Sequence, residues 1–246
     1  MNNPFTLVGK TILVTGASAG IGRGIAVACA GMGARVILTA RNTERLQETL
    51  SQLEGDGHTY IAADLTNEAE RRALVEQLPI LDGVVQCAGV GSRVPCKMLV
   101  QDDLDRVMKP NAEAPMLLQA QLLIEKKLKK QASVVFIASA AATMPVIGNA
   151  VYSASKAALV AYAKCLAQEL APRQIRVNCI SPTMVWTDLI KEDLSMEQLK
   201  KAEGNYPLGR FGKSEDIAYL SIYLLSNVSE WMTGNNIEIT GGSLIG

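Results

Sequence analysis

Tyr152 and Lys156 lie four residues apart, near the start of a segment that the sequence predicts to be helical. On a helix this spacing places the phenol and the ammonium on the same face. A cation held beside a tyrosine favours the phenolate, which brings proton exchange with a bound alcohol or carbonyl within reach of neutral pH. None of the other tyrosines has a lysine at this spacing. The pair therefore indicates general acid and base chemistry, with a chance pairing on a half-exposed helix as the competing interpretation.

The elements that must hold such a pair are short β-type runs, which alternate with amphipathic segments of helix length. This alternation predicts an α/β fold in one domain, residues 1–246, whose parallel sheet carries helices on both faces. The expected strands are residues 11–15, 35–39, 59–63, 83–87, 133–138, 176–180 and 236–240.

Two segments break this alternation. Pro110 interrupts an otherwise helical region and predicts a kink, because proline cannot donate its N–H to the helix. Residues 189–210 are amphipathic but contain Gly204 and Pro207. We expect them to form a substrate-binding flap over a site.

The composition argues against several other classes of protein. The 246 residues contain 24 Lys+Arg and 24 Asp+Glu, so the total charge favours neither nucleic acid nor a membrane surface as a partner. No apolar stretch reaches the roughly 18 residues of a membrane span, and we expect a cytoplasmic protein. His58 is the single histidine, and the five cysteines lack the close pairing of a zinc site. We therefore expect no metal, reduced and buried thiols, and a solvated helix end at the lysine-rich run 126–130.

A glycine-rich turn follows the first expected strand, with Gly16, Gly20 and Gly22 ahead of a helix-forming run. Glycines at this spacing let the backbone turn tightly and approach a pyrophosphate, while free N–H groups at the helix start attract the phosphates. The position after the first strand of an α/β pattern favours a dinucleotide over a purely structural turn.

The end of the second expected strand bears on which dinucleotide binds. An acid that would bind the ribose hydroxyls of NAD is absent there, and Arg41 precedes Asn42 instead. A planar guanidinium suits a 2′-phosphate, so we expect a preference for NADPH, with NADH as an alternative. The competing interpretation is that Arg41 begins the next helix and faces solvent.

These motifs occur in the order and at the spacing of the short-chain dehydrogenase/reductase family, which the sequence resembles over nearly its whole length. The matching segments are residues 15–22, Tyr152 with Lys156, and the closing Gly241-Gly242. The resemblance implies a Rossmann fold with a doubly wound, seven-stranded parallel sheet, and an NAD(P)-dependent oxidoreductase that acts on alcohols or carbonyls. Within the family the sequence is most similar to bacterial 3-oxoacyl carrier-protein reductases, notably over residues 207–212 and 215–218.

The resemblance also implies roles for single residues. Ser139, thirteen residues before Tyr152, would hydrogen-bond the carbonyl oxygen that Tyr152 protonates. Lys156 would hold the nicotinamide ribose, and the backbone carbonyl of Asn111 would hold a water that links the lysine to solvent. The expected cofactor contacts are Gly16, Ser18, Gly20, Ile21, Gly22, Arg41, Asn42, Asp64, Leu65, Ala88, Gly89, Tyr152, Lys156, Pro182, Val185 and Thr187.

Three segments depart from the family's pattern. Gln86-Cys87 replaces Asn-Asn, Thr183 replaces a glycine after Pro182, and Thr240 stands where aspartate often precedes the last glycines. The acid and base residues are unaffected. The departures bear on cofactor affinity and on the choice of substrate.

The substrate stays open at this point. Met144, Met184 and Trp186 predict a mostly apolar pocket. A 3-oxoacyl thioester is one candidate, and a polyol, sugar or hydroxysteroid is the alternative. Lys130 and Arg173 match positions that present basic groups to an acidic acyl carrier protein, although solvated surface charge would explain them as well. The resemblance implies a homotetramer, and a non-catalytic NADPH-binding redox sensor is the alternative outside the enzymes.

Overall fold

A single parallel sheet forms the centre of the protein. The structure is a computed structural model that describes residues 3–187, 190 and 195–243. Seven strands pair in the order β3-β2-β1-β4-β5-β6-β7, and every pair is parallel. The strands are β1 (Thr11–Thr15), β2 (Arg35–Ala40), β3 (Thr59–Ala62), β4 (Leu81–Gln86), β5 (Leu128–Ile137), β6 (Arg176–Pro182) and β7 (Asn236–Ile239). The seven expected strands are thus confirmed, and β5 begins earlier than expected.

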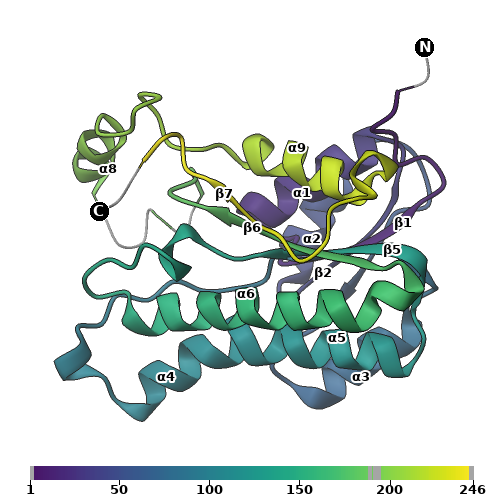
Figure 1. Ribbon diagram of the computed structural model, residues 1–246, viewed down its shortest axis with the longest axis horizontal. Coiled ribbons are helices and arrows are strands. Elements are labelled where there is room, and N and C mark those ends of the chain that lie inside the picture. The colour runs from purple at the N-terminus through teal and green to yellow at the C-terminus, as the bar shows by residue number, and fades with distance from the viewer. Residues whose placement is uncertain (1–2, 188–189, 191–194, 244–246) are drawn as a thin grey trace.

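Helices cover both faces of this sheet, as Figure 1 shows. The helices are α1 (Gly20–Gly31), α2 (Thr43–Leu50), α3 (Glu68–Gln77), α4 (Gln101–Met108), α5 (Ala114–Ile124), α6 (Ala150–Leu170), α8 (Met196–Glu203) and α9 (Ser214–Leu225). Successive strand residues point to opposite faces. Val134 and Phe136 therefore pack in a core with α3, α5 and α6, while Val135 packs in a second core with α1, α2 and α9. Burial on both faces explains why the central strands are mostly apolar.

The strand order reverses between β1 and β4. Their following loops leave the sheet in opposite directions, and open α/β sheets bind ligands in the crevice at this place. The expected site segments after β1, β2, β3, β4, β5 and β6 all follow the carboxyl ends of their strands. The topology therefore brings them to one edge of the sheet.

The expected kink at Pro110 is a π-helical turn, Lys109–Glu113, which joins α4 to α5 without a break. The N–H of Ala114 donates to the carbonyl of Lys109, five residues back. Pro115 stands four residues after Asn111 and has no N–H, so the carbonyl of Asn111 cannot accept its α-helical hydrogen bond. The two prolines thus widen the helix at the position of Asn111.

Two expectations about the surface are wrong. The helix before the lysine-rich run ends at Ile124 and β5 begins at Leu128, so Lys129 lies on a strand and pairs with Asp82 at 2.8 Å. All five cysteines are free, as expected, but Cys96 and Cys165 are exposed because they lie on a loop turn and on the outer side of α6. In the described segments, no helix has the length and apolar character needed to cross a bilayer.

Candidate active site

The acid and base pair lies on α6 beside the carboxyl end of β5. Lys156 is 5% exposed, and its ammonium donates to the carbonyl of Ile137 at 3.0 Å. The Nζ atom lies 5.8 Å from the centre of the Tyr152 ring, within the range of a cation–π contact. Tyr152 is half-buried at the edge of the crevice. The helix therefore presents both groups on one face, as their spacing predicts.

Ser139 follows β5 and begins a short 3-10 turn, Ala140–Ala142. Its Oγ accepts a hydrogen bond from the backbone N–H of Ala141 at 3.2 Å. A hydroxyl that accepts in this way keeps its own hydrogen for another acceptor. Ser139 is thus fixed by the backbone and keeps the capacity to donate.

Asn111 is fully buried and connects three segments of the site. Its Oδ1 accepts from the N–H of Val90 at 2.7 Å, and its Nδ2 donates to the carbonyl of Val90 at 2.9 Å and to Ser155 Oγ at 3.1 Å. A Cβ atom on Gly89 would lie 3.0 Å from Asn111 Oδ1 and 3.3 Å from Lys156 Nζ. The loop after β4 therefore passes directly against both polar groups and requires a small residue there.

The glycine turn packs tightly on the start of α1 and on the end of β4. Gly16 has a φ of 64°, and a Cβ atom on Gly22 would collide with the carbonyl oxygen of Gly16. Thr15 Oγ1 accepts from the N–H groups of Cys87 and Ala88 at 3.0 and 3.1 Å, which joins β1 to β4 at the switch point. No described side chain caps the first N–H groups of α1. These groups are suited to an anion such as a pyrophosphate.

Arg23 and Thr49 fix the glycine turn through hydrogen bonds to its backbone carbonyls. Neither residue was identified from the sequence. Arg23 donates to the carbonyl of Ser18 at 2.6 Å and to Thr49 Oγ1 at 2.9 Å. The Thr49 hydroxyl in turn donates to the carbonyl of Ala17 at 3.0 Å. The arginine beside Gly22 was visible in the sequence, but 26 residues separate it from the threonine that completes the contact.

The loops after β2 and β3 form the other end of the crevice. Arg41 is exposed, while the side chain of Asn42 accepts from the N–H of Arg45 at 2.8 Å and caps α2. Burial raises the pKa of Asp64, but hydrogen bonds from Thr66 and the nearby Arg41 guanidinium outweigh it and hold the pKa below its usual value. Arg41 is therefore near Asp64, which precedes the buried Leu65, in the region expected to hold adenosine.

The segment after β6, residues 183–187, crosses from the sheet to the flap; we call it the strap. Val185 pairs with Gly212, and a Cβ atom on Gly20 would lie 3.0 Å from the methyl of Thr187. The strap thus lies against the end of the glycine turn, where α1 begins. Part of the expected flap, residues 189 and 191–194, lies outside the described residues.

The described part of the flap has a small core of its own. Leu199, Tyr206 and Phe211 are buried together, and Met184 and Trp186 pack against them. These last two residues were expected to border the substrate. They also form the joint between strap and flap, and their contact with a substrate stays a prediction.

Three comparisons place this geometry among known proteins. Residues 16–243 match a family model described as enoyl-(acyl carrier protein) reductase. A 3-oxoacyl-[acyl-carrier-protein] reductase of Rickettsia prowazekii is 33% identical over 239 residues, 97% of this chain and 98% of that protein. The chain belongs to the short-chain dehydrogenase/reductase family. It is therefore an NAD(P)-dependent short-chain oxidoreductase.

Other members of this family differ in their substrates. An L-xylulose reductase of Caenorhabditis elegans is 35% identical over 240 residues, 95% of each chain. The crystal structure of a dehydrogenase/reductase from Sinorhizobium meliloti 1021 matches with a TM-score of 0.88 and 33% identity, over 97% of this chain and 96% of that one. Membership therefore establishes the Rossmann fold and the oxidoreductase class, and leaves the substrate open.

The departures from the family's pattern are accommodated by local contacts. Gln86 Nε2 donates to the carbonyl of Pro115 at 3.0 Å, and burial raises the pKa of the Cys87 thiol to about 12, so this thiol stays neutral. Thr183 Oγ1 donates to the carbonyl of Thr240 at 3.2 Å. Two of the departures thus bond to each other, and this contact fixes the strap to the end of β7.

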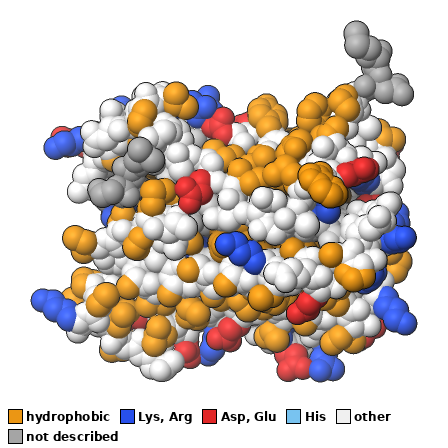
Figure 2. Space-filling model, in the orientation of Figure 1, with side chains coloured by type: hydrophobic (Ala, Val, Ile, Leu, Met, Phe, Trp, Pro, Cys, Tyr) orange, Lys and Arg blue, Asp and Glu red, His pale blue; other side chains and the backbone are white. Residues whose placement is uncertain are grey.

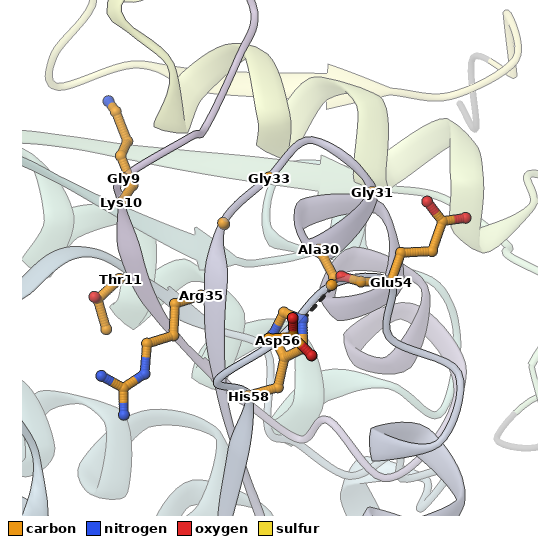
Figure 3. A pocket seen from close by; sticks show the side chains of 12 residues that line it. Gly9, Lys10, Thr11, Ala30, Gly31, Gly33, Arg35, Glu54, Asp56 and His58 are labelled. Carbon is orange, nitrogen blue, oxygen red and sulfur yellow. Dashed lines mark hydrogen bonds between the residues drawn. The ribbon is translucent and has the colours of Figure 1, made fainter.

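A second hollow, of about 500 Å³, lies at the amino-terminal edge of β1 and β2 (Figure 3). The side chains of Lys10, Arg35 and Glu54 point away from one another in this view. Both ring nitrogens of His58 already have backbone partners. Nδ1 accepts from the N–H of Val36 at 3.1 Å, and Nε2 lies 2.9 Å from the carbonyl oxygen of Glu54. The hollow lacks convergent polar groups and lies opposite the edge where such sheets bind ligands.

Proposed function

We propose that this short-chain oxidoreductase reduces a carbonyl group to a secondary alcohol and that NADPH is its preferred cofactor. The observation that carries the proposal is the convergence of Ser139, Tyr152 and Lys156 at the edge of the sheet where the glycine turn begins α1. Asn111 joins this group through Gly89, which contacts both Asn111 and Lys156.

The residues around the crevice fit a dinucleotide. The N–H groups at the start of α1 suit its phosphates, Asp64 and Leu65 lie where its adenine would bind, and Ala88 and Gly89 border its centre. Pro182, at the end of β6, and the strap residues Val185 and Thr187 lie on the nicotinamide side. When bound, the cofactor supplies the hydride that reduces the carbonyl carbon.

The protein's own residues supply the proton and stabilise the developing charge. Tyr152 donates its hydroxyl proton to the carbonyl oxygen, and Ser139 donates a hydrogen bond to the same oxygen as negative charge develops. The Lys156 ammonium stabilises the phenolate that remains. Asn111 contributes a backbone carbonyl that lacks its α-helical donor, and a water bound there would return a proton towards Lys156.

Arg41 supports the preference for NADPH. It follows β2 directly, it is exposed, and its guanidinium suits bidentate contact with a 2′-phosphate. Asp64 nearby is the counter-argument, because a carboxylate repels a phosphate. The hydroxyl and the backbone N–H of Thr66 donate to one oxygen of Asp64 at 2.7 and 2.9 Å, and these bonds leave less of that oxygen free to repel a phosphate.

Among carbonyl substrates, a 3-oxoacyl thioester is our first candidate and a keto sugar the second. The first is favoured by the similarity to the Rickettsia reductase, and the second by the similar identity to the L-xylulose reductase. The test is NADPH oxidation by the purified protein with acetoacetyl thioesters, diketones and keto sugars. We expect the thioester to give the highest kcat/KM. A higher kcat/KM with a keto sugar would replace the first candidate by the second, and NADPH binding without turnover on any carbonyl would favour the redox sensor.

We also propose that an acyl carrier protein docks near Lys130 and Arg173, which lie at the amino-terminal ends of β5 and β6, and that it serves the active site of a neighbouring subunit. Lys130 is exposed, whereas Arg173 donates to the carbonyl of Leu128 and so is partly used within the fold. Lys130→Glu should raise KM for a thioester carried by acyl carrier protein and leave KM for a small thioester unchanged. Equal effects on the two substrates would argue against docking at this place.

The proposed assembly is a homotetramer in the cytoplasm. Large apolar side chains are exposed on the outer faces of α4 and α5, at Leu104, Leu117 and Ile124. Figure 2 shows hydrophobic side chains gathered in a band over these helices and α6, and again over the region of α9. Apolar faces of this kind are commonly covered by other subunits.

A further inference from the structure

Glu203, at the end of α8, joins the flap to the strap through one oxygen atom. Its Oε1 accepts from the indole N–H of Trp186 at 2.7 Å and from the backbone N–H of Phe211 at 2.9 Å. These two donors hold the pKa of Glu203 below its usual value. The carboxylate is therefore charged at neutral pH and makes two charge-assisted hydrogen bonds.

The aromatic residues around Glu203 reinforce this joint. The Trp186 ring lies 5.3 Å from that of Phe211, and the Phe211 ring lies 5.1 Å from that of Tyr206 in an edge-to-face contact. The Tyr206 hydroxyl accepts from the N–H of Met184 at 3.3 Å. Both ends of the flap segment that the structure describes, α8 and residues 206–211, are thus attached to the strap.

The strap in turn reaches the cofactor side of the crevice. Trp186 is followed directly by Thr187, whose methyl lies against Gly20 at the start of α1. Backbone bonds between Trp186 and Gly212 at 2.8 Å and between Gly212 and Met184 at 3.0 Å hold the strap in register. A continuous set of contacts therefore runs from Glu203 through Trp186 to the glycine turn.

Nearby cations contribute less to the low pKa of Glu203 than its two hydrogen-bond donors do. Arg210, the adjacent cation, is bound by both oxygens of Asp216 at 2.7 and 3.0 Å and anchors the flap to the start of α9. The bonds to Trp186 and Phe211 are thus the specific contacts of the Glu203 carboxylate among the described residues.

We propose that Glu203 is a positioning residue that couples the flap on the substrate side to the strap on the cofactor side. Through Trp186, one carboxylate sets the position of both walls of the active site. Loss of the carboxylate should therefore weaken cofactor binding although Glu203 lies on the flap. The kinetic part of this proposal, and the choice of NADPH as the ligand for the binding test, rest on the proposed function, whereas the spectroscopic part does not.

The first experiment measures the joint itself. The chain has two tryptophans, and Trp231 is 99% exposed, so a Trp231→Phe background leaves Trp186 as the single reporter. In that background Glu203→Ala should shift the Trp186 emission to longer wavelength and increase its quenching by acrylamide. Glu197→Gln, an exposed acid on the first turn of the same helix, is the matched control and should change neither. Unchanged emission in Glu203→Ala would show that the joint does not depend on Glu203.

The second experiment measures the coupling to the cofactor. Glu203→Ala should raise the Kd of NADPH about tenfold, as expected for the loss of the one charge-assisted hydrogen bond that reaches the strap, at Trp186. Glu203→Gln keeps an acceptor oxygen in the same place, so its Kd should lie between those of the alanine variant and the native protein. Trp186→Phe keeps the ring but removes the donor, and should raise the Kd without adding to the effect of Glu203→Ala in the double variant.

An NADPH Kd within twofold of the native value for Glu203→Ala would overturn the coupling. So would additive effects of Glu203→Ala and Trp186→Phe. If the carbonyl panel gives turnover, KM for the carbonyl should rise with the Kd of NADPH while kcat changes little. If the panel gives no turnover, the proposed reduction fails, and the Kd and fluorescence measurements still decide the role of Glu203.

Discussion

Burial and charge conflict at Lys156. Its ammonium is buried, and its described hydrogen-bond partner is the neutral carbonyl of Ile137. Placing a charge in such a site costs free energy unless a negative partner compensates for it. A phenolate at Tyr152 and the hydroxyls of a bound ribose would supply that compensation, so the cost is tied to function.

This conflict makes a prediction for stability. Lys156→Met replaces the ammonium by an apolar group of similar length. We expect an unchanged or higher Tm without cofactor, because the buried ammonium destabilises the fold. We also expect turnover to fall at least roughly 100-fold, because the proposed reaction depends on that ammonium. Thermal unfolding and steady-state assays measure both quantities. A variant that unfolds at lower temperature would show that Lys156 supports the fold.

Arg41 gives the second prediction at this scale. Arg41→Asp removes the guanidinium and offers a carboxylate to the ribose hydroxyls, so kcat/KM should fall at least roughly tenfold for NADPH and should hold or rise for NADH. Arg45→Leu, an exposed arginine on α2, is the matched control and should leave the ratio unchanged. The preference is contradicted if the native protein uses NADH as well as or better than NADPH.

At the scale of elements, the widened helix at Asn111 depends on Pro115. Pro115→Ala restores an N–H four residues after Asn111, and that donor would compete with a water for the Asn111 carbonyl. We expect a higher Tm, since proline is unfavourable inside a helix, together with a lower kcat. Pro110→Ala is the comparison, because it restores no donor to Asn111. A native kcat in Pro115→Ala would show that this carbonyl takes no part in turnover.

Elements differed in how well the sequence predicted them. Six strands were evident within about two residues at each end because they are short, rich in apolar or β-branched residues, and separated by helix-length segments. The first part of β5 was missed because Lys129 and Lys130 are polar, and it is a strand because Leu128 pairs with Leu81. The sequence predicted only a kink near Pro110. Predicting the widened helix would have required knowing which backbone carbonyl loses its hydrogen-bond donor.

The residues of the site divide in the same way. Spacing on one helix drew attention to Tyr152 and Lys156, and the family resemblance favoured the pair over a chance pairing and supplied Ser139 and Asn111. Their supporting contacts were not predictable, because each joins segments that are distant in the chain. Asn111 bonds to Val90, 21 residues away, and Glu203 bonds to Trp186, 17 residues away.

At the scale of the whole molecule, the family resemblance predicts a homotetramer, and the exposed apolar side chains indicate surfaces that other subunits would cover. Trp231 is 99% exposed and Ile124 is 72% exposed in the single chain, which is costly for side chains of this size. We expect sedimentation or light scattering to give a mass close to four times the 26.3 kDa of one chain. A mass near that of one chain would contradict the tetramer.

The turnover of Tyr152→Phe tests the central claim most directly, because the change removes the transferable proton and leaves the shape of the ring. With the best carbonyl of the panel and saturating NADPH, we predict that kcat falls by at least roughly 100-fold while the Kd of NADPH stays near its native value. A Tyr152→Phe enzyme that keeps near-native kcat would contradict the role of Tyr152 as the proton donor.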